Sequence, residues 1–313
     1  MVNELGTDVQ RHRHLGRVAS NPRGLFAASF TEPAAGSDNL LPYNAPGAGM
    51  QTFAEPVDGG WEINGMKRYI SNANRADTII CFARTDRFGP LTESVTAFLV
   101  PFEKVRIGTV HDKCGERIAN NSEIFYEGTF VPAADLLGQE GDALRSVGRL
   151  LRASNAYAAA CSLGIARECF DRTLAWCRSR IQGGKPIIEH QAVGSYLADM
   201  YLNVDIMRTY IWRAAWQAAS AATFDPSLAI APKLATSERT FDSARRAMEL
   251  WGGAGVMREN GIEKLLRDAS IWLHSDGTNI VLRERLANIL RSAEPDRVFW
   301  DGVPADAPMV GII

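Results

Sequence analysis

The sequence has no long hydrophobic run and no strong excess of charge of either sign. Arg, Ser or Asp interrupts its apolar stretches well before the roughly 20 residues that a membrane-spanning helix needs. Lys and Arg number 34 against 36 Asp and Glu, so a net charge of -2 offers no positive field to nucleic acid or an anionic membrane. Met1 to Val18 contains no apolar segment typical of a secretory signal. We therefore expect a cytoplasmic protein with neither nucleic acid nor a membrane as partner.

Cysteine is also scarce, and its spacing suggests neither a disulfide framework nor a metal site. The five cysteines are Cys81, Cys114, Cys161, Cys169 and Cys177. No pair has CxxC spacing and no His stands at a zinc-ligand offset, so we expect reduced thiols and no metal. The last three recur every eight residues in a helical stretch, where core packing explains them better than redox chemistry.

Hydrophobic residues make up 46% of the 313 residues, which excludes a disordered chain, and their periodicity divides the sequence into four zones. Residues 1–26 contain a short polar helix, Thr7 to Ala19, ended by Asn-Pro. Residues 27–137 carry short apolar runs typical of strands. Residues 138–294 follow the 3 and 4 spacing of helices. The tail, 295–313, contains two prolines and is expected to be irregular.

The second zone predicts a β domain. Apolar runs such as Thr78 to Ala83 and Val95 to Val100 alternate with turns rich in Gly, Asn and Pro, with no helix between them. Trp61 to Ile63, Asn64-Gly65 and Met66 to Ile70 predict a β-hairpin with a tight turn at Asn64-Gly65. Strands without intervening helices indicate an antiparallel barrel or sandwich rather than a dinucleotide-binding fold of alternating strands and helices.

The third zone predicts a bundle of four long helices. One helix face runs from Val193 to Ala222 and is followed by a break at Asp225-Pro226. Similar patterns cover residues 141–179, 227–251 and 277–291. The expected fold is therefore α+β, an antiparallel β-barrel followed by a four-helix bundle.

Two segments could hold a ligand. Gly252-Gly253-Ala254-Gly255 follows a helix rather than a strand and so fails as a dinucleotide-binding fingerprint. It is either a helix C-cap or a turn whose bare backbone lets a ligand approach. The loop Thr31 to Asp38 offers hydroxyls and amides to a polar ligand or a phosphate, or is an ordinary turn.

A third segment could carry catalysis. Asp276 lies at a Gly-containing break between two helical patterns, where its carboxylate could face a cleft. Arg283 follows seven residues later, two helical turns on, and could share its face. The alternative is that Asp276 is only the N-cap of the following helix.

Together these segments resemble the acyl-CoA dehydrogenase flavoproteins, from about Leu5 to Leu290 and in the same order along the chain. No single motif carries the resemblance. The matching segments are Thr31 to Asp38 (TEPxAGSD), Lys67 to Asn72 (K-x-W-I-T-N), Gly115 to Arg117 (GxR), Glu189 to Ala192 (EHQA) and Glu249 to Val256 with Glu259, Lys264 and Asp268.

The resemblance implies an FAD site shared between subunits, and hence a homo-oligomer, a dimer or more usually a tetramer. Thr31 would bond the flavin ring edge and Ser37 the pyrophosphate. Tyr69 would stack near the flavin, with Ser71 close to N5, and Arg180 would reach the phosphates across the dimer interface. The expected FAD contacts are Phe30, Thr31, Gly36, Ser37, Tyr69, Ser71, Arg180, Gln191, Glu249, Gly252, Gly253 and Thr278.

The resemblance also implies the reaction, in which a base takes the α-proton of an acyl thioester while a hydride leaves the β-carbon for flavin N5. Asp276 stands where most members have a Glu before Gly-Thr, so Asp276 and Arg283 are the expected catalytic residues. An electron-transfer protein would reoxidise the flavin in fatty acid metabolism. The expected substrate contacts are Ser37, Ser154, Asn155, Ser275 and Gly277.

Departures from the family leave two alternatives open. An Asp with an Arg seven residues on also resembles nitroalkane oxidases, so a flavin oxidase or monooxygenase is possible on this fold. Residues 1–26 match only the end of the family's N-terminal helical domain and are interpreted as its remnant. The chain could therefore be a non-catalytic FAD-holding subunit that assembles with a homologous full-length subunit. Glu249 replaces a usual Gln and would bring negative charge near the phosphates.

Overall fold

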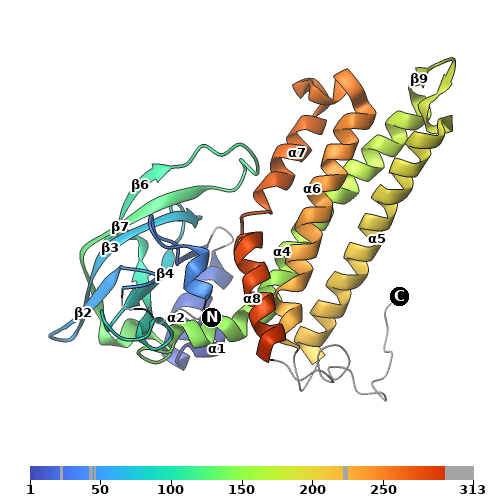
Figure 1. Ribbon diagram of the computed structural model, residues 1–313. Coiled ribbons are helices and arrows are strands. Elements are labelled where there is room, and N and C mark those ends of the chain that lie inside the picture. Colours follow the sequence, from blue (N-terminus) through green and yellow to red (C-terminus); the bar gives the residue numbers. More distant parts are fainter. Residues whose placement is uncertain (22–23, 42–44, 46, 221–224, 293–313) are drawn as a thin grey trace. The chain divides into compact units, whose positions relative to one another are not determined.

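The computed structural model describes residues 1–21, 24–41, 45, 47–220 and 225–292. They form two compact units (Figure 1). The sheet unit comprises Met1–Lys113 and Arg117–Leu150, and the helical unit comprises Cys114–Glu116 and the chain from Leu151. The division falls within helix α4, whereas the boundary predicted at residues 137/138 precedes that helix. The tail expected to be irregular lies outside the described residues.

The sheet unit opens with α1 (Val2–Leu5) and α2 (Asp8–Ser20). Thr7 caps α2, because its hydroxyl accepts from the amide of Gln10 while the Gln10 side chain accepts from the amide of Thr7. Gln10 Nε2 also donates to the carbonyls of Ala134 and Leu136, which fastens α2 to the sheet unit. The helix predicted over Thr7 to Ala19 is confirmed.

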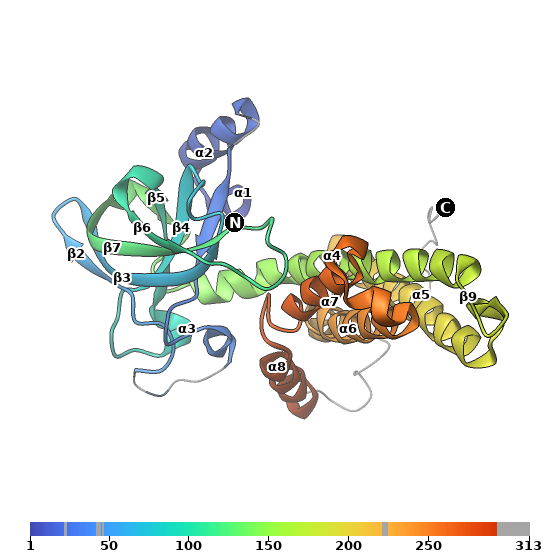
Figure 2. The same ribbon diagram turned by 90° about the horizontal axis from the view of Figure 1, so that it is seen from above.

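The strands of the sheet unit form one mixed sheet (Figure 2). Both β1 and β2 pair with β4 in parallel, so the prediction of a purely antiparallel sheet is wrong. The hydrogen-bonded order does not close on itself, so the predicted barrel is not confirmed, whereas the α+β class is. The order is β6 (Arg106–Val110), β7 (Asn121–Pro132), β3 (Gly60–Ser71), β2 (Phe53–Val57), β4 (Thr78–Arg84), β5 (Val95–Pro101) and β8 (Leu136–Leu137), with β1 (Phe26–Ser29) beside β4.

The core of this unit lies on both faces of β4 and β5. All seven residues of β4 are buried, which explains why Thr78 to Ala83 reads as a continuous run rather than an alternating one. One face packs with Ile63 and Tyr126, and the other with Leu91 and the first turn of α4 at Ala143. The sheet therefore has a dry interior that can hold charged groups only if they are paired.

The hairpin predicted around Asn64-Gly65 is wrong, because β3 continues through this dipeptide. The tight turn lies earlier, at Asp58-Gly59, between β2 and β3. At Asn64-Gly65 the register against β7 shifts instead, and Asn64 Oδ1 accepts from the amide of Gly128 at 2.7 Å. A Cβ on Gly65 would lie 2.6 Å from Thr52 Oγ1, so this glycine serves a bulge and a close approach.

The helical unit is built from α4 (Ala143–Ser179), α5 (Gln191–Ser220) and α6 (Ala231–Trp251), with the shorter α7 (Ile262–Ile271) and α8 (Asn279–Ser292) (Figure 1). Small residues let the long helices approach. Ser162 Oγ on α4 donates to Thr240 Oγ1 on α6 at 2.8 Å, and Ala214 and Ala244 are fully buried. The break predicted at Asp225-Pro226 is confirmed, since Asp225 caps the short helix that follows.

Core packing of the cysteine stripe is confirmed for Cys169 and Cys177, which are fully buried, whereas Cys161 is half-buried. The short β9 (Ile181–Gln182) and β10 (Lys185–Pro186), like β8, were missed because two-residue strands leave no periodicity. Among the described helices, none has the length and apolar composition needed to cross a membrane.

Candidate functional site

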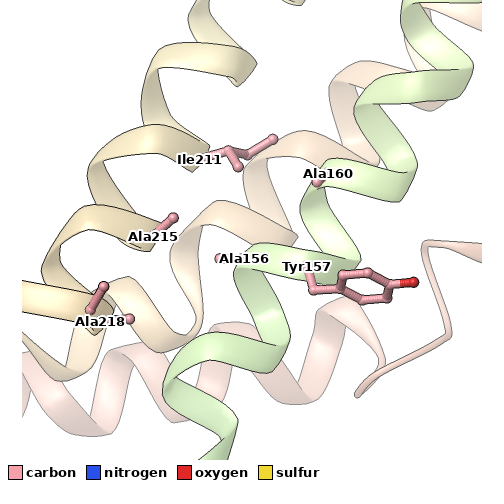
Figure 3. A pocket seen from close by; sticks show the side chains of 7 residues that line it. Ala156, Tyr157, Ala160, Ile211, Ala215 and Ala218 are labelled. Carbon is pink, nitrogen blue, oxygen red and sulfur yellow. The ribbon is translucent and has the colours of Figure 1, made fainter. Parts of the chain in front are cut away.

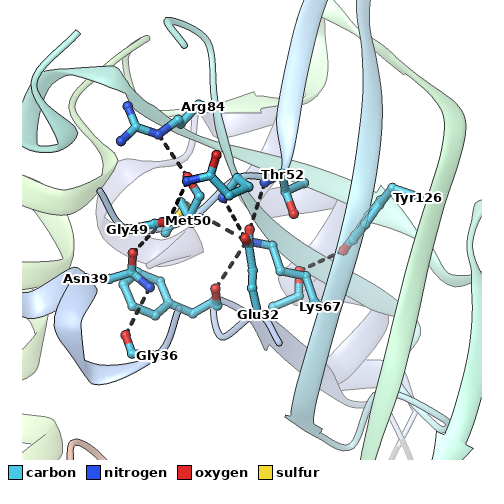
Figure 4. Close-up of polar contacts among 12 residues, drawn as sticks. Glu32, Gly36, Asn39, Gly49, Met50, Thr52, Lys67, Arg84 and Tyr126 are labelled. Atoms are coloured by element: carbon cyan, nitrogen blue, oxygen red, sulfur yellow. Dashed lines mark hydrogen bonds and ion pairs between the residues drawn. The ribbon is translucent and has the colours of Figure 1, made fainter. Parts of the chain in front are cut away.

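The loop Thr31 to Asp38 leaves the end of β1 and is anchored by a buried ion pair (Figure 4). Lys67 Nζ on β3 lies 2.8 Å from Glu32 Oε1, with 0% and 4% of the two side chains exposed. Glu32 also accepts from the amides of Gln51, at 2.5 Å, and Thr52, at 2.9 Å. Lys67 donates to the carbonyl of Phe30 at 3.1 Å, so the start of the loop rests on this pair.

Electrostatics favours the ionised pair. Burial would raise the pKa of Glu32, but the Lys67 ammonium and the surrounding donors lower the pKa below its ordinary value. Farther along the loop, Asp38 Oδ1 accepts from the amide of Gly36 at 2.6 Å. The half-buried side chains of Thr31 and Ser37 thus stand on a fixed backbone.

The end of β3 presents an aromatic ring on unusual backbone. Tyr69 has a φ of 62° and remains 54% exposed, and its ring lies 5.0 Å from that of His111. Asn121 Nδ2 on β7 donates to the carbonyl of Tyr69 at 2.9 Å and to Ser71 Oγ at 3.1 Å. His111 Nε2 is buried and has no hydrogen-bond partner within the described part of the chain. An exposed ring held this way is suited to stacking on a planar ligand.

In the helical unit, the chain between α7 and α8 carries the predicted catalytic carboxylate. Asp276 has a φ of 52° and Gly277 a φ of 89°, so two consecutive residues are left-handed. α8 begins only at Asn279, and Thr278 Oγ1 accepts from the amide of Val281 at 3.5 Å. The N-cap interpretation of Asp276 is therefore wrong, because Thr278 occupies that position and leaves the carboxylate available.

A lysine lies beside this carboxylate. Burial of its carboxyl group raises the pKa of Asp276, although the residue as a whole is exposed, and the ammonium of Lys233 lowers the pKa in opposition. Arg283, expected on the same face, instead bonds Glu238 on α6. The electrostatic partner of Asp276 is thus a residue that the sequence did not single out.

The glycine turn after α6 leaves its backbone open. A Cβ on Gly252 or Gly253 would meet no atom within 4 Å, and Gly252 has a φ of 57°. The negative charge of Glu249 is neutralised, because Arg245 bonds its carboxylate one helical turn away. Bare amides without an adjacent uncompensated carboxylate can approach a polyanion.

Next to that turn, Arg180 stacks at 5.5 Å over the ring of Trp176, which itself stacks on Trp251 at 4.3 Å. Among the described residues, Arg180 is paired with no carboxylate. Trp251 Nε1 is buried without a hydrogen-bond partner in the described chain. A polar ligand with stacking surface and negative charge would satisfy both groups.

The remaining residues that were predicted to contact FAD or substrate lie on several different elements. Asn155 is buried on α4 and donates to the carbonyl of Ala229, so its amide serves helix packing. Ser154 beside it is half-buried, and Gln191 is the exposed first residue of α5. Ser275 lies in the turn before Asp276, and the Phe30 ring packs edge-on against Phe82. The role of each in binding stays a prediction.

A groove of about 370 Å³ lies between α4 and α5 (Figure 3). Its described lining is apolar apart from Tyr157, whose hydroxyl points away from Ala215 and Ala218 (Figure 3), and it contains none of the predicted site residues. The lining residues are Ala156, Tyr157, Ala160, Ile211, Ala215, Ala218 and Ala219. Its described lining residues include no carboxylate or basic group that could serve as a general acid or base.

Sequence reasoning missed four residues that shape these sites: Glu32, Lys67, His111 and Lys233. Two of them stand inside motifs that were recognised, yet received no role. The available signal was a charged residue at a core position, namely Lys67 on the buried face of β3 and Lys233 on the inner face of α6.

Family models match a part of the chain in each of the two units. Residues 27–129 match the family model of the acyl-CoA dehydrogenase middle domain, and residues 144–290 match that of the acyl-CoA dehydrogenase C-terminal domain. A probable acyl-CoA dehydrogenase of Bacillus subtilis is 34% identical over 287 residues, covering 91% of this chain and 73% of the relative.

Solved structures are similar as well. Butyryl-CoA dehydrogenase from Megasphaera elsdenii aligns with a TM-score of 0.85 and 27% identity, over 93% of this chain and 74% of the other. The prolyl acyl carrier protein oxidase AnaB aligns with a TM-score of 0.84 and 26% identity, over 92% and 74% of the two chains.

Proposed function

Because this chain belongs to the acyl-CoA dehydrogenase family of FAD-dependent oxidoreductases, we propose that it dehydrogenates acyl-CoA or acyl-carrier thioesters with Asp276 as the base. The observation that carries the proposal is the carboxylate itself. It stands on a left-handed turn, is not used as a helix cap, and has a raised pKa. A raised pKa brings a carboxylate closer to the range in which it can accept and retain a proton.

The residues present fit FAD. Tyr69 offers an exposed ring on the sheet unit, and the fixed loop offers the Thr31 and Ser37 hydroxyls. On the helical unit, the open Gly252-Gly253 backbone suits phosphate or adenine, as does the cation of Arg180, which pairs with no carboxylate of the described residues. When bound, FAD accepts at N5 the hydride that leaves the substrate β-carbon.

This chain's own part in the reaction is proton chemistry and positioning. The Asp276 carboxylate takes the proton from the α-carbon of the thioester as the α,β carbon–carbon bond becomes double. Ser71, held by Asn121, would bond close to the flavin edge, and the Tyr69 ring would cover its face. The proposal also includes reoxidation by an electron-transfer protein, a cytoplasmic location and a homo-oligomer.

The first test is the visible spectrum of the purified protein during anaerobic titration with thioesters of different chain length. We expect bound flavin to bleach with at least one acyl-CoA or acyl-carrier thioester. Bleaching by nitroalkanes alone, or rapid reaction of the reduced flavin with oxygen, would favour an oxidase. Flavin that no compound bleaches would favour a holding subunit, and would contradict the dehydrogenase.

Arg180→Ala is expected to weaken FAD retention and dimerisation together. Hydrogen bonds to charged groups contribute about 1.5–3 kcal/mol, so the FAD dissociation constant should rise roughly 10- to 100-fold. Flavin fluorescence in the filtrate and sedimentation velocity measure the two effects. The control is Arg167→Ala, since Arg167 is an exposed arginine on α4, the helix that ends just before Arg180, and it pairs with Asp171 one turn away. Loss of neither property would refute this role of Arg180.

A further inference from the structure

We propose that Lys233 is the positioning residue for Asp276: its buried ammonium clamps the turn that carries the carboxylate and favours the ionised, proton-accepting form. The inference rests on the proposed function, because it deepens the role given to Asp276. It does not make Lys233 a catalytic residue, since the lysine acts through the turn.

The clamp is visible in the hydrogen bonds of Lys233. Lys233 is 1% exposed and lies on the inner face of α6. Its Nζ donates to the carbonyl of Gly277 at 2.7 Å and to Asn279 Oδ1 at 2.9 Å. One ammonium therefore holds the residue directly after Asp276 and the first residue of α8.

Neighbouring side chains complete the clamp. Asn279 Nδ2 donates to Ser237 Oγ at 3.1 Å and to Glu238 Oε1 at 3.3 Å. Glu238 in turn accepts from Arg283 on α8. The start of α8 is thus tied to α6 through a polar network that is buried at Lys233, Ser237 and Asn279 and reaches the surface at Glu238 and Arg283. Such networks specify one geometry when their members are satisfied.

The turn needs such support because its backbone is strained. Asp276 is a non-glycine residue with positive φ, followed by a second left-handed residue, Gly277. Left-handed conformations persist only where the surroundings determine them, and they concentrate at functional sites. Without the bond to the Gly277 carbonyl, the Gly277–Thr278 peptide would be free to rotate, and the left-handed turn that places the carboxylate of Asp276 would lose its support.

Opposing effects act on the pKa of Lys233. Burial lowers the pKa of Lys233 to about 8, while the carboxylates of Asp276 and Glu238 oppose that shift. From α4, Cys161 faces the same carboxylate, and its own pKa is raised mainly by burial, with Glu116 and Asp276 adding to the effect. Below about pH 8, Lys233 is charged and should lower the pKa of Asp276. Above about pH 8, Lys233 loses its proton and this effect on the pKa of Asp276 should disappear.

The test is the rate of flavin reduction against pH for the holoenzyme, with the best thioester from the titration as substrate. An opposite charge within about 4–6 Å typically lowers a carboxyl pKa by 1–3 units. Lys233→Met should therefore raise the kinetic pKa assigned to Asp276 by about one unit or more and slow maximal reduction by roughly 100-fold, the cost of a small misplacement. The control is Lys185→Met, because Lys185 is half-buried and its ammonium donates to a main-chain carbonyl, that of Glu189, away from Asp276 in the chain.

Lys233→Arg keeps a positive charge at every accessible pH. It should preserve the wild-type kinetic pKa of Asp276 and remove any inflection near pH 8, and it also serves if Lys233→Met fails to fold. If both variants merely lower thermal stability and leave the kinetic pKa of Asp276 unchanged, Lys233 is only a structural residue and the inference is overturned.

A stability cycle separates this inference from the proposed function, since it needs no turnover. Lys233→Met, Lys233→Arg and Asp276→Asn are made singly, and each variant of Lys233 is also combined with Asp276→Asn. Urea unfolding is followed below and above pH 8, with the methionine variants as the uncharged reference. Coupling between the two sites should fade above pH 8 with lysine and persist with arginine. Coupling without any dependence of flavin reduction on Asp276 would sink the proposed function alone. Absence of coupling, with reduction still dependent on Asp276, would sink the inference alone.

Discussion

Asp276→Asn is expected to retain FAD and to lose substrate-dependent flavin reduction, by about 100- to 10,000-fold, the usual contribution of a positioned general base. Asparagine has the same size and adopts left-handed backbone readily, so the turn at φ 52° should survive the change. What disappears is the ability to take a proton. Anaerobic stopped-flow reduction measures the rate, and the flavin absorbance of the purified variant measures retention.

The same variant should become more stable near neutral pH. Because burial raises the folded-state pKa of Asp276, the wild-type carboxyl favours folding while protonated and loses that contribution as pH rises through its raised pKa. Asparagine does not ionise and escapes this loss. Thermal unfolding against pH should therefore show a gain for Asp276→Asn that appears only above the ordinary pKa of an Asp.

Asp276→Glu is the informative companion, since it restores the longer carboxylate that most of the family carries. The rate of proton abstraction depends steeply on the position of the reacting carboxylate oxygen. Faster reduction of long or branched thioesters by this variant would mean that the short arm of Asp276 sets substrate choice. Unchanged reduction in Asp276→Asn would instead mean that another group takes the proton, and the assignment would be withdrawn.

The sequence predicted the elements of the helical unit well because long amphipathic helices repeat their signal over many turns. The face from Val193 onward predicted α5, and the Asp225-Pro226 break predicted where the next helix could start. Residue types also identified the break that carries Asp276, since a Gly next to polar residues interrupts any helix pattern. Local chemistry was sufficient for these features.

The sheet was harder because pairing is a long-range property. Asn64-Gly65 has the local composition of a hairpin turn, yet β7 pairs with β3 on both sides of it and makes it a bulge. The parallel pairing of β1 with β4 joins residues about fifty positions apart, which no window of sequence records. Lys233 was missed for the same reason, because its partners at Gly277 and Asn279 meet it only in the folded chain.

Lys67→Met is expected to have the largest effect on stability. Both members of the Lys67–Glu32 pair are buried, and removing one charge leaves the other without a partner in the sheet core. Breaking a buried pair in this way costs about 3–5 kcal/mol. Urea unfolding of the purified protein near pH 7 measures the loss. The exposed pair Arg106–Glu127 in the same sheet is the control, since Arg106→Met should cost far less than Lys67→Met.

The pH dependence identifies the cause. In the wild type the lowered pKa of Glu32 contributes stability above the ordinary pKa of a Glu, and that stability is lost as pH falls through the lowered value. In Lys67→Met, burial acts unopposed by the ammonium and raises the pKa of Glu32. The deficit of the variant should therefore be largest near neutral pH and shrink on acidification. A deficit that stays constant with pH would reflect lost packing alone.

The double variant Lys67→Met with Glu32→Gln completes the argument. It removes both charges while the glutamine oxygen can still accept from the amides of Gln51 and Thr52. Replacing a buried pair by neutral residues is often far less costly than breaking it, so the double variant should be more stable than Lys67→Met. It should also recover the geometry of the Thr31 to Asp38 loop, because that loop rests on Glu32. If the double variant regained stability but did not retain FAD, the ammonium of Lys67 itself would be needed to hold the loop in its binding form, through the carbonyl of Phe30.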